Sequence, residues 1–132
     1  MKIVYGPKGT GKTKAIIESA NQALETAKGH VIFVTDTTRY TYDLSNQIRY
    51  LDVTGFDVIG EDGLRGFIKG LVAANGDNEY IYVDGIARIT GKPLSELDNI
   101  FAAMEKLEKD GNKKDGKYSV PTLAKKEMIE AY

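Results

Sequence analysis

The residues best suited to chemistry lie together in one glycine-rich stretch near the start of the chain. Residues 6–13 read Gly-Pro-Lys-Gly-Thr-Gly-Lys-Thr and fit the phosphate-binding pattern G-x-x-x-x-G-K-S/T at every fixed position. The glycines allow the backbone to wrap around an anion, so that successive N–H groups point at its oxygens. Lys12, expected on a solvent-facing loop, can reach the outer phosphates of a nucleotide, and the Thr13 hydroxyl can ligate Mg²⁺. The predicted phosphate-binding residues are Gly6, Gly9, Thr10, Gly11, Lys12, Thr13 and Lys14.

Two predicted elements hold this stretch in place. Residues 2–5 have the apolar character of a short buried strand, and residues 12–28 show the apolar periodicity of a helix that ends before Gly29. A helix that starts at the glycine-rich stretch adds unpaired N–H donors and the positive end of its dipole to the anion site. The pattern requires this arrangement of strand, glycine loop and helix, so phosphate binding is favoured over an ordinary glycine-rich turn.

The stretch and its flanking elements resemble the phosphate loop of the P-loop NTPases over about residues 1–30. A second motif extends the resemblance to the middle of the chain. There an apolar strand at residues 80–83 is followed by Asp84, as in the carboxylate motif of that superfamily. One or two carboxylates together with phosphates are enough to hold Mg²⁺. The resemblance implies ATP and Mg²⁺ as cofactors, with Thr13 as a metal ligand and Asp84 supporting the metal through water.

Polar residues also follow a second predicted strand, at residues 31–35. They are Asp36, Thr37, Thr38 and Arg39. Because the carboxyl ends of parallel strands face the ligand crevice, Asp36 and Arg39 are candidates for contacts with substrate, water or phosphate. Asp36 thereby joins Lys12 and Asp84 as a candidate catalytic residue. A polar turn with a helix cap is the alternative interpretation of this segment.

The rest of the chain alternates between strand-like and helix-like segments. We expect strands at 47–53 and 118–120, helices at 61–74, 95–109 and 122–131, and a charged loop at 109–117. This alternation predicts an α/β fold with a mostly parallel sheet of about five strands and helices on both faces. The resemblance makes that fold a P-loop NTPase-like three-layer sandwich. The length of 132 residues is typical of one domain, so we expect a single nucleotide-binding domain over residues 1–132.

Composition argues against several other classes of protein. The formal net charge of -1 makes an electrostatic nucleic-acid binder unexpected. The chain has no cysteine, which excludes disulfides and thiolate metal sites, and His30 as its only histidine excludes a histidine metal centre. No apolar run has membrane-spanning length and no signal-peptide pattern opens the sequence. We therefore expect a cytoplasmic protein without a membrane partner.

Two further motifs favour a different nucleotide. Asn112 and Asp115 fit the N-K-x-D form that reads guanine, and Asp52 and Gly55 fit the D-x-x-G form that senses a γ-phosphate. Their order and spacing resemble those of small GTPases. In that family N-K-x-D ends a buried strand, whereas a polar, charged segment precedes it here, and the later Ser-Ala-Lys element has no counterpart. A GTPase-like switch therefore stays as an alternative to ATP binding.

We expect the protein to be a slow or partner-activated ATPase. Gly85 stands where many ATPases place a glutamate that orients the attacking water, and Asp36, Asp52 or Glu61 could substitute for it. The arginine that stabilises the transferring phosphate could come from this chain or from a protein partner. The candidates within the chain are Arg39, Arg49, Arg65 and Arg88.

Other functions remain open at this stage. The chain also resembles short bacterial P-loop proteins sometimes labelled twitching-motility ATPases, although it lacks the histidine-bearing motifs and additional N-terminal domain of those motors. A small-molecule kinase would bind its acceptor near Asp36 and Arg39. A nucleotide sensor would bind ATP without turnover.

Overall fold

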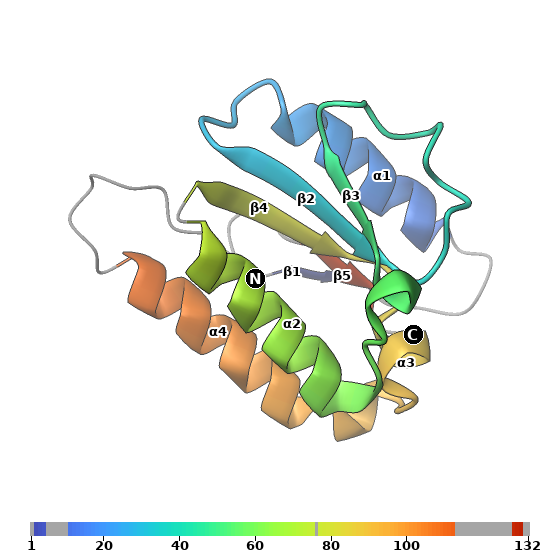
Figure 1. Cartoon of the computed structure of the whole chain (residues 1–132), viewed down its shortest axis with the longest axis vertical. Coiled ribbons are helices and arrows are strands. Elements are labelled where there is room, and N and C mark those ends of the chain that lie inside the picture. Colours follow the sequence, from blue (N-terminus) through green and yellow to red (C-terminus); the bar gives the residue numbers. More distant parts are fainter. Residues whose placement is uncertain (1, 5–10, 76, 113–127, 131–132) are drawn as a thin grey trace.

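The computed structural model describes residues 2–4, 11–75, 77–112 and 128–130, and shows a parallel sheet between helices (Figure 1). The strands are β1 (Lys2–Val4), β2 (His30–Thr35), β3 (Arg49–Asp52), β4 (Asn78–Val83) and β5 (Met128–Glu130). The α-helices are α1 (Lys12–Ala23), α2 (Gly60–Ala74), α3 (Ile86–Thr90) and α4 (Asp98–Asn112). Two short 3₁₀-helices, η1 (Val53–Phe56) and η2 (Leu94–Glu96), lie between them.

The described strands pair in the order β1-β5-β4-β2-β3, and every pairing is parallel. The longest ladder joins β2 to β4, and β3 adds to the other edge of β2. The three-residue strands β1 and β5 continue the sheet beyond β4. Because all strands run the same way, their carboxyl ends meet at one edge, which is where ligands bind in open α/β sheets.

Both faces of the sheet are covered, which explains why β2 is apolar over residues 31–34 and β4 over residues 80–83 without alternation. Alternate residues of these strands, Val31, Phe33, Tyr80 and Tyr82, face α1 in one core. The residues between them, Ile32, Val34, Ile81 and Val83, face α2, α3 and α4 in a second core. Figure 1 shows the same division, with α1 on one side of the sheet and the other helices on the opposite side. The prediction of an α/β fold with a parallel sheet and helices is confirmed.

Helix α1 is fixed to the centre of the sheet by its apolar side and by one polar contact. Ile16 and Ala20 are fully buried against the sheet. The Tyr82 hydroxyl donates to the Ser19 carbonyl at 3.3 Å and lies at the same distance from the Ser19 hydroxyl. These contacts set the direction in which the first turn of α1 meets the carboxyl edge of the sheet.

Several predicted boundaries are wrong. Helix α1 ends at Ala23 rather than at residue 28, and the Lys28 and Gly29 amides instead donate to the Glu79 carboxylate at 2.9 and 3.4 Å. Helix α4 begins at Asp98, because residues 94–96 form η2 and the Glu96 amide bonds to the Pro93 carbonyl at 3.0 Å. It continues to Asn112, three residues beyond the predicted end at residue 109.

The largest error concerns the end of the chain. Residues 122–131 were expected to form a helix, but residues 128–130 form β5. Ile129 pairs with Ile3 of β1 and with Val83 of β4, so β5 fills the place between these two strands. A parallel strand in that place is specified by its neighbours rather than by local propensity. The predicted strand at 118–120 and the rest of the predicted helix lie outside the described residues.

Candidate nucleotide site

The first turn of α1 brings the second half of the glycine-rich stretch to the carboxyl edge of the sheet. Gly11 is the N-cap of α1 and adopts a left-handed conformation with φ of 82°. Lys12 begins the helix with only 6% of its surface exposed, so the expectation that it lies on a solvent-facing loop is wrong. Lys14 is exposed. Gly6, Gly9 and Thr10 lie outside the described residues.

Asp84 follows β4 and is fully buried. Its amide donates to the Val34 carbonyl at 2.8 Å, which holds this residue against β2. One carboxylate oxygen, Oδ1, accepts from the Thr13 hydroxyl at 3.2 Å. The other, Oδ2, accepts from the Thr35 hydroxyl at 3.2 Å and from Arg88 Nη2 at 3.3 Å. A buried carboxylate needs such partners, and here they come from α1, β2 and α3.

The contact between Thr13 and Asp84 joins residues 71 positions apart in the chain. A hydroxyl and a carboxylate are both oxygen donors of the kind that Mg²⁺ prefers, so the residues present fit the predicted cation. Among the described residues, no group of three or more His, Cys, Asp or Glu side chains could hold a metal ion. A cation at this place would therefore draw further oxygen ligands from a bound molecule or from water.

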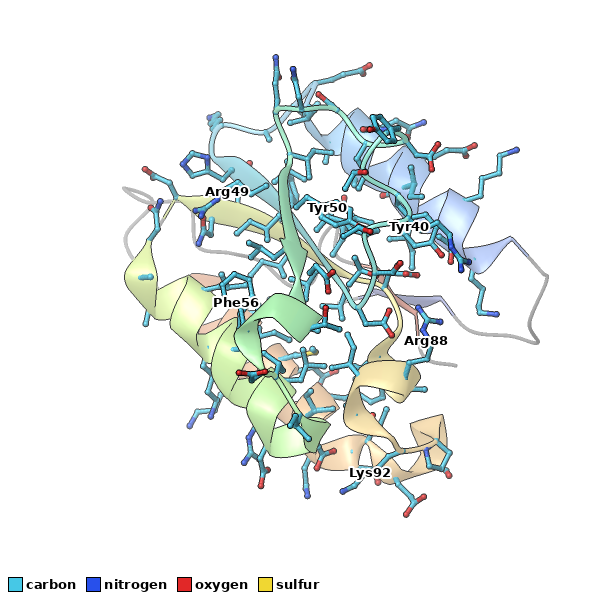
Figure 2. All side chains as sticks on the ribbon, turned by 45° about the vertical axis from the view of Figure 1, so that its right-hand side comes forward. Tyr40, Arg49, Tyr50, Phe56, Arg88 and Lys92 are labelled. Atoms are coloured by element: carbon cyan, nitrogen blue, oxygen red, sulfur yellow. The ribbon has the colours of Figure 1, made fainter. Side chains whose placement is uncertain are left out.

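Arg88 links Asp84 to Asp36. Its Nε donates to Asp36 Oδ2 at 3.1 Å, and its Nη2 reaches both Asp36 Oδ1 and Asp84 Oδ2 at 3.3 Å. Arg88 lies one helical turn after Asp84, on the short helix α3, and Figure 2 labels it beside the carboxyl edge of the sheet. Asp36, which was predicted as a catalytic residue, therefore shares Arg88 with Asp84. Its carboxylate forms an ion pair with that arginine.

Gly85 makes this arrangement of Arg88 possible. It is the N-cap of α3, with φ of 85°, and it is buried. A Cβ atom at this position would lie 2.8 Å from Arg88 Cζ and closer still to Nη2. The guanidinium therefore occupies the space that a side chain at position 85 would need.

The other carboxylates proposed to activate water are engaged elsewhere. Asp52 caps η1, accepting from the Thr54 amide at 3.0 Å and from the Thr54 hydroxyl at 2.6 Å. Glu61, at the start of α2, is 8% exposed and lies 3.7 Å from Lys92 Nζ through Oε1. Asp52 is thus bound to Thr54 and Glu61 lies beside Lys92, whereas the described partners of Asp84 are Thr13, Thr35 and Arg88.

The other candidate arginines are also distributed over the molecule. Arg49 begins β3 and is exposed, and Figure 2 shows it at the opposite end of the strands from Arg88. Arg65 pairs with Asp62 at 2.8 Å on the outer surface of α2. Arg39 is exposed in the loop after β2. Arg88, by contrast, donates to Asp84 through Nη2.

Tyr50 supports the loop that carries Asp36. Its hydroxyl donates a short hydrogen bond to the Thr37 carbonyl, and its ring stacks on Phe33 with centroids 5.8 Å apart. Burial raises the pKa of the Tyr50 hydroxyl above its usual value of 10.0, and the Asp52 and Asp84 carboxylates add to this effect. Figure 2 shows Tyr40 and Tyr50 on the same part of the molecule, where both pack against the core beside α1.

Sequence reasoning missed two residues of this cluster as partners of Asp84. Thr35 ends an apolar strand at the same edge, and a polar residue in that position was a usable signal. Arg88 was one of four equivalent candidates because the short helix α3 was not predicted. Spacing alone could have indicated it, since residues four apart meet on a helix.

No protein-family model matches this chain, and no curated protein matches it. None of the helices in the described ranges combines the length and apolar character of a membrane-spanning segment.

Proposed function

We propose that the chain is a single cytoplasmic nucleotide-binding domain with the P-loop NTPase fold, and that it binds ATP with Mg²⁺ and hydrolyses it slowly. The observation that carries this proposal is the hydrogen bond between Thr13 and Asp84. The resemblance to P-loop NTPases implied both residues as the metal site, and their contact supports that role. A chance glycine-rich turn would give no reason for the two to meet at the carboxyl edge of a parallel sheet.

Each residue has a specific role in this proposal. Lys12 and the backbone amides of residues 9–13 hold the phosphates, and Thr13 ligates the cation. Asp84 holds the cation through water, with its orientation set by Thr35 and Arg88. When bound, Mg²⁺ would neutralise charge on the phosphate oxygens. Lys12 begins α1, so its amide and side chain can serve the same anion.

Slow turnover is proposed because the candidate carboxylates for activating water, Asp36, Asp52 and Glu61, all have other partners among the described residues. Asp36 shares Arg88 with Asp84, and two hydrogen bonds hold it to that arginine. Both oxygens of this carboxylate, Oδ2 and Oδ1, already accept hydrogen bonds from Arg88, so neither is free to orient an attacking water or to accept a proton from an acceptor hydroxyl. This argument favours a slow ATPase over a small-molecule kinase with Asp36 as its base.

The GTP alternative receives less support. Asn112 is the last residue of helix α4, whereas the guanine-reading motif of small GTPases follows a buried strand. Asp52 of the D-x-x-G match caps a 3₁₀-helix after β3. Asp115 lies outside the described residues. We therefore propose ATP as the preferred nucleotide.

A magnesium titration tests this proposal. Asp84→Asn keeps the size of the side chain and removes its charge, so ATP affinity in Mg²⁺ should fall at least about tenfold while metal-free affinity changes little. Asp62→Asn is the matched control, because Asp62 is 87% exposed on α2. It should behave like the unmodified protein in calorimetric titrations of ATP at several Mg²⁺ concentrations. An unchanged Mg²⁺ dependence in Asp84→Asn contradicts the proposed metal role.

A further inference from the structure

The guanidinium of Arg88 is held at the carboxyl edge of the sheet by hydrogen bonds to two carboxylates. Asp36 accepts two hydrogen bonds from it, at 3.1 and 3.3 Å, in a fork-like arrangement. Asp84 accepts a third through Oδ2. Paired contacts of this type fix the plane of a guanidinium as well as its position. Arg88 is therefore preorganised, although 45% of its side chain remains exposed.

The carboxylate of Asp84 contacts both this guanidinium and the proposed metal ligand Thr13. Oδ1 faces the Thr13 hydroxyl, and Oδ2 faces Arg88. A single carboxylate group therefore lies between the metal ligand and the arginine. A nucleotide whose phosphates are bound at the first turn of α1, beside Thr13, would bring its terminal phosphate toward this carboxylate and toward the guanidinium that is bound to it.

Glycine at position 85 leaves room for the guanidinium of Arg88. Many ATPases carry a glutamate directly after the motif aspartate, but any side chain here would collide with Arg88. The chain has a left-handed glycine at this place, and the guanidinium fills the space beside Asp84. The positively charged guanidinium of Arg88 thus lies beside position 85, where those ATPases have the negatively charged side chain of glutamate.

We propose that Arg88 supplies, from within the chain, the positive charge that stabilises the terminal phosphate of ATP during its transfer to water. This inference rests on the proposed function. Of the two sources considered for this arginine, the chain itself and a protein partner, it favours the chain. Fixed positive groups aimed at developing negative charge are among the largest contributors to catalysis, and an arginine in this role acts either within a chain or from a partner.

In the reaction that Arg88 would assist, the terminal phosphate of ATP is transferred to water. The oxygen of water forms a bond to the terminal phosphorus, and the bond from that phosphorus to the bridging oxygen breaks. The electron pair of the broken bond stays on the bridging oxygen of ADP. The products are ADP, inorganic phosphate and the proton released by water. Arg88 donates hydrogen bonds to oxygens that gain negative charge and exchanges no proton.

The test separates turnover from binding. Arg88→Ala and Arg88→Lys should lower the rate of phosphate release at saturating ATP and Mg²⁺ by about 10²-fold or more. Their ATP affinity, measured by calorimetry, should fall by a much smaller factor than the rate, because Thr13 and Thr35 still hold Asp84 when Arg88 is replaced. Arg49→Ala is the matched control, since Arg49 is an exposed arginine at the other end of the strands. Added guanidinium ion at millimolar concentration should restore part of the activity of Arg88→Ala only.

The possible outcomes distinguish the inference from the function on which it rests. An unmodified protein that fails to bind ATP with Mg²⁺ overturns the proposed function and the inference together. If the unmodified protein binds ATP and turns it over, then equal turnover by Arg88→Ala overturns the inference alone. Binding without any phosphate release by the unmodified protein also overturns it. The inference is also overturned if both Arg88 variants lose turnover only because they bind ATP more weakly or fail to fold, and if guanidinium does not restore the turnover of Arg88→Ala.

Discussion

Replacing Gly85 by alanine should displace Arg88 without touching a charged residue. The new Cβ would lie 2.8 Å from Arg88 Cζ, so the guanidinium must shift, and we expect it to lose its contacts with Asp84 and Asp36. The left-handed backbone, with φ of 85°, adds strain of about 1–2 kcal/mol for a residue with a side chain. Losing the partly exposed pair with Asp36 costs about 0–1 kcal/mol. Losing the hydrogen bond to buried Asp84 costs about 1 kcal/mol more.

Gly91→Ala isolates the backbone part of this effect. Gly91 also has a positive φ, of 72°, but a Cβ there would meet nothing within 4 Å. Its cost should be the strain alone, about 1–2 kcal/mol. Gly85→Ala should therefore be less stable than Gly91→Ala by about 1–2 kcal/mol, from the Arg88 contacts just described.

Urea unfolding and ATP turnover measure the two consequences separately. We expect Gly85→Ala to lose turnover as Arg88→Ala does, and Gly91→Ala to retain it. Equal stability of the two alanine variants, with full turnover in both, would refute the reasoning, because Arg88 would then not depend on the space at position 85.

Two further predictions concern pH and nucleotide choice. The pKa of the Tyr50 hydroxyl is raised in the folded protein. As pH rises through 10, the unfolded chain therefore loses this proton while the folded protein keeps it. The free energy of unfolding should then decrease with rising pH above that value. Tyr50→Phe should make this decrease less steep in urea unfolding between about pH 9 and 11, and an identical slope would exclude Tyr50 as its cause. Asp115→Asn should change the binding of ATP and of GTP by less than about 0.5 kcal/mol, with ATP preferred by the unmodified protein. A preference for GTP that this substitution removes would reverse the nucleotide assignment.

The parts of the fold that follow from local pattern could be predicted. Residues 31–34 and 80–83 are apolar without alternation, which is typical of strands covered on both faces, and both lie in the central ladder. The meeting of Thr13 with Asp84 followed from the same logic, because parallel strands place their carboxyl ends at one edge.

What could not be predicted depends on contacts between distant segments. Residues 122–131 contain helix-forming residues, yet Met128–Glu130 is a strand because a place exists for it between β1 and β4. The position of Arg88 depends on a left-handed Gly85, a short helix and the carboxylate of Asp36 in the loop after β2. A single-sequence pattern contains none of these relations.

The most direct test of the account is a calorimetric titration of ATP in the presence of Mg²⁺ into the unmodified protein and into Lys12→Met. Methionine retains the apolar stem of this buried side chain and removes the charge that we assign to the phosphates. Lys69→Ala, an exposed lysine on α2, serves as the control. We predict one bound ATP per chain for the unmodified protein and the control, and at least about tenfold weaker binding by Lys12→Met with an unchanged unfolding transition. Equal affinity of Lys12→Met and the unmodified protein, or no ATP binding by the unmodified protein, would contradict the account.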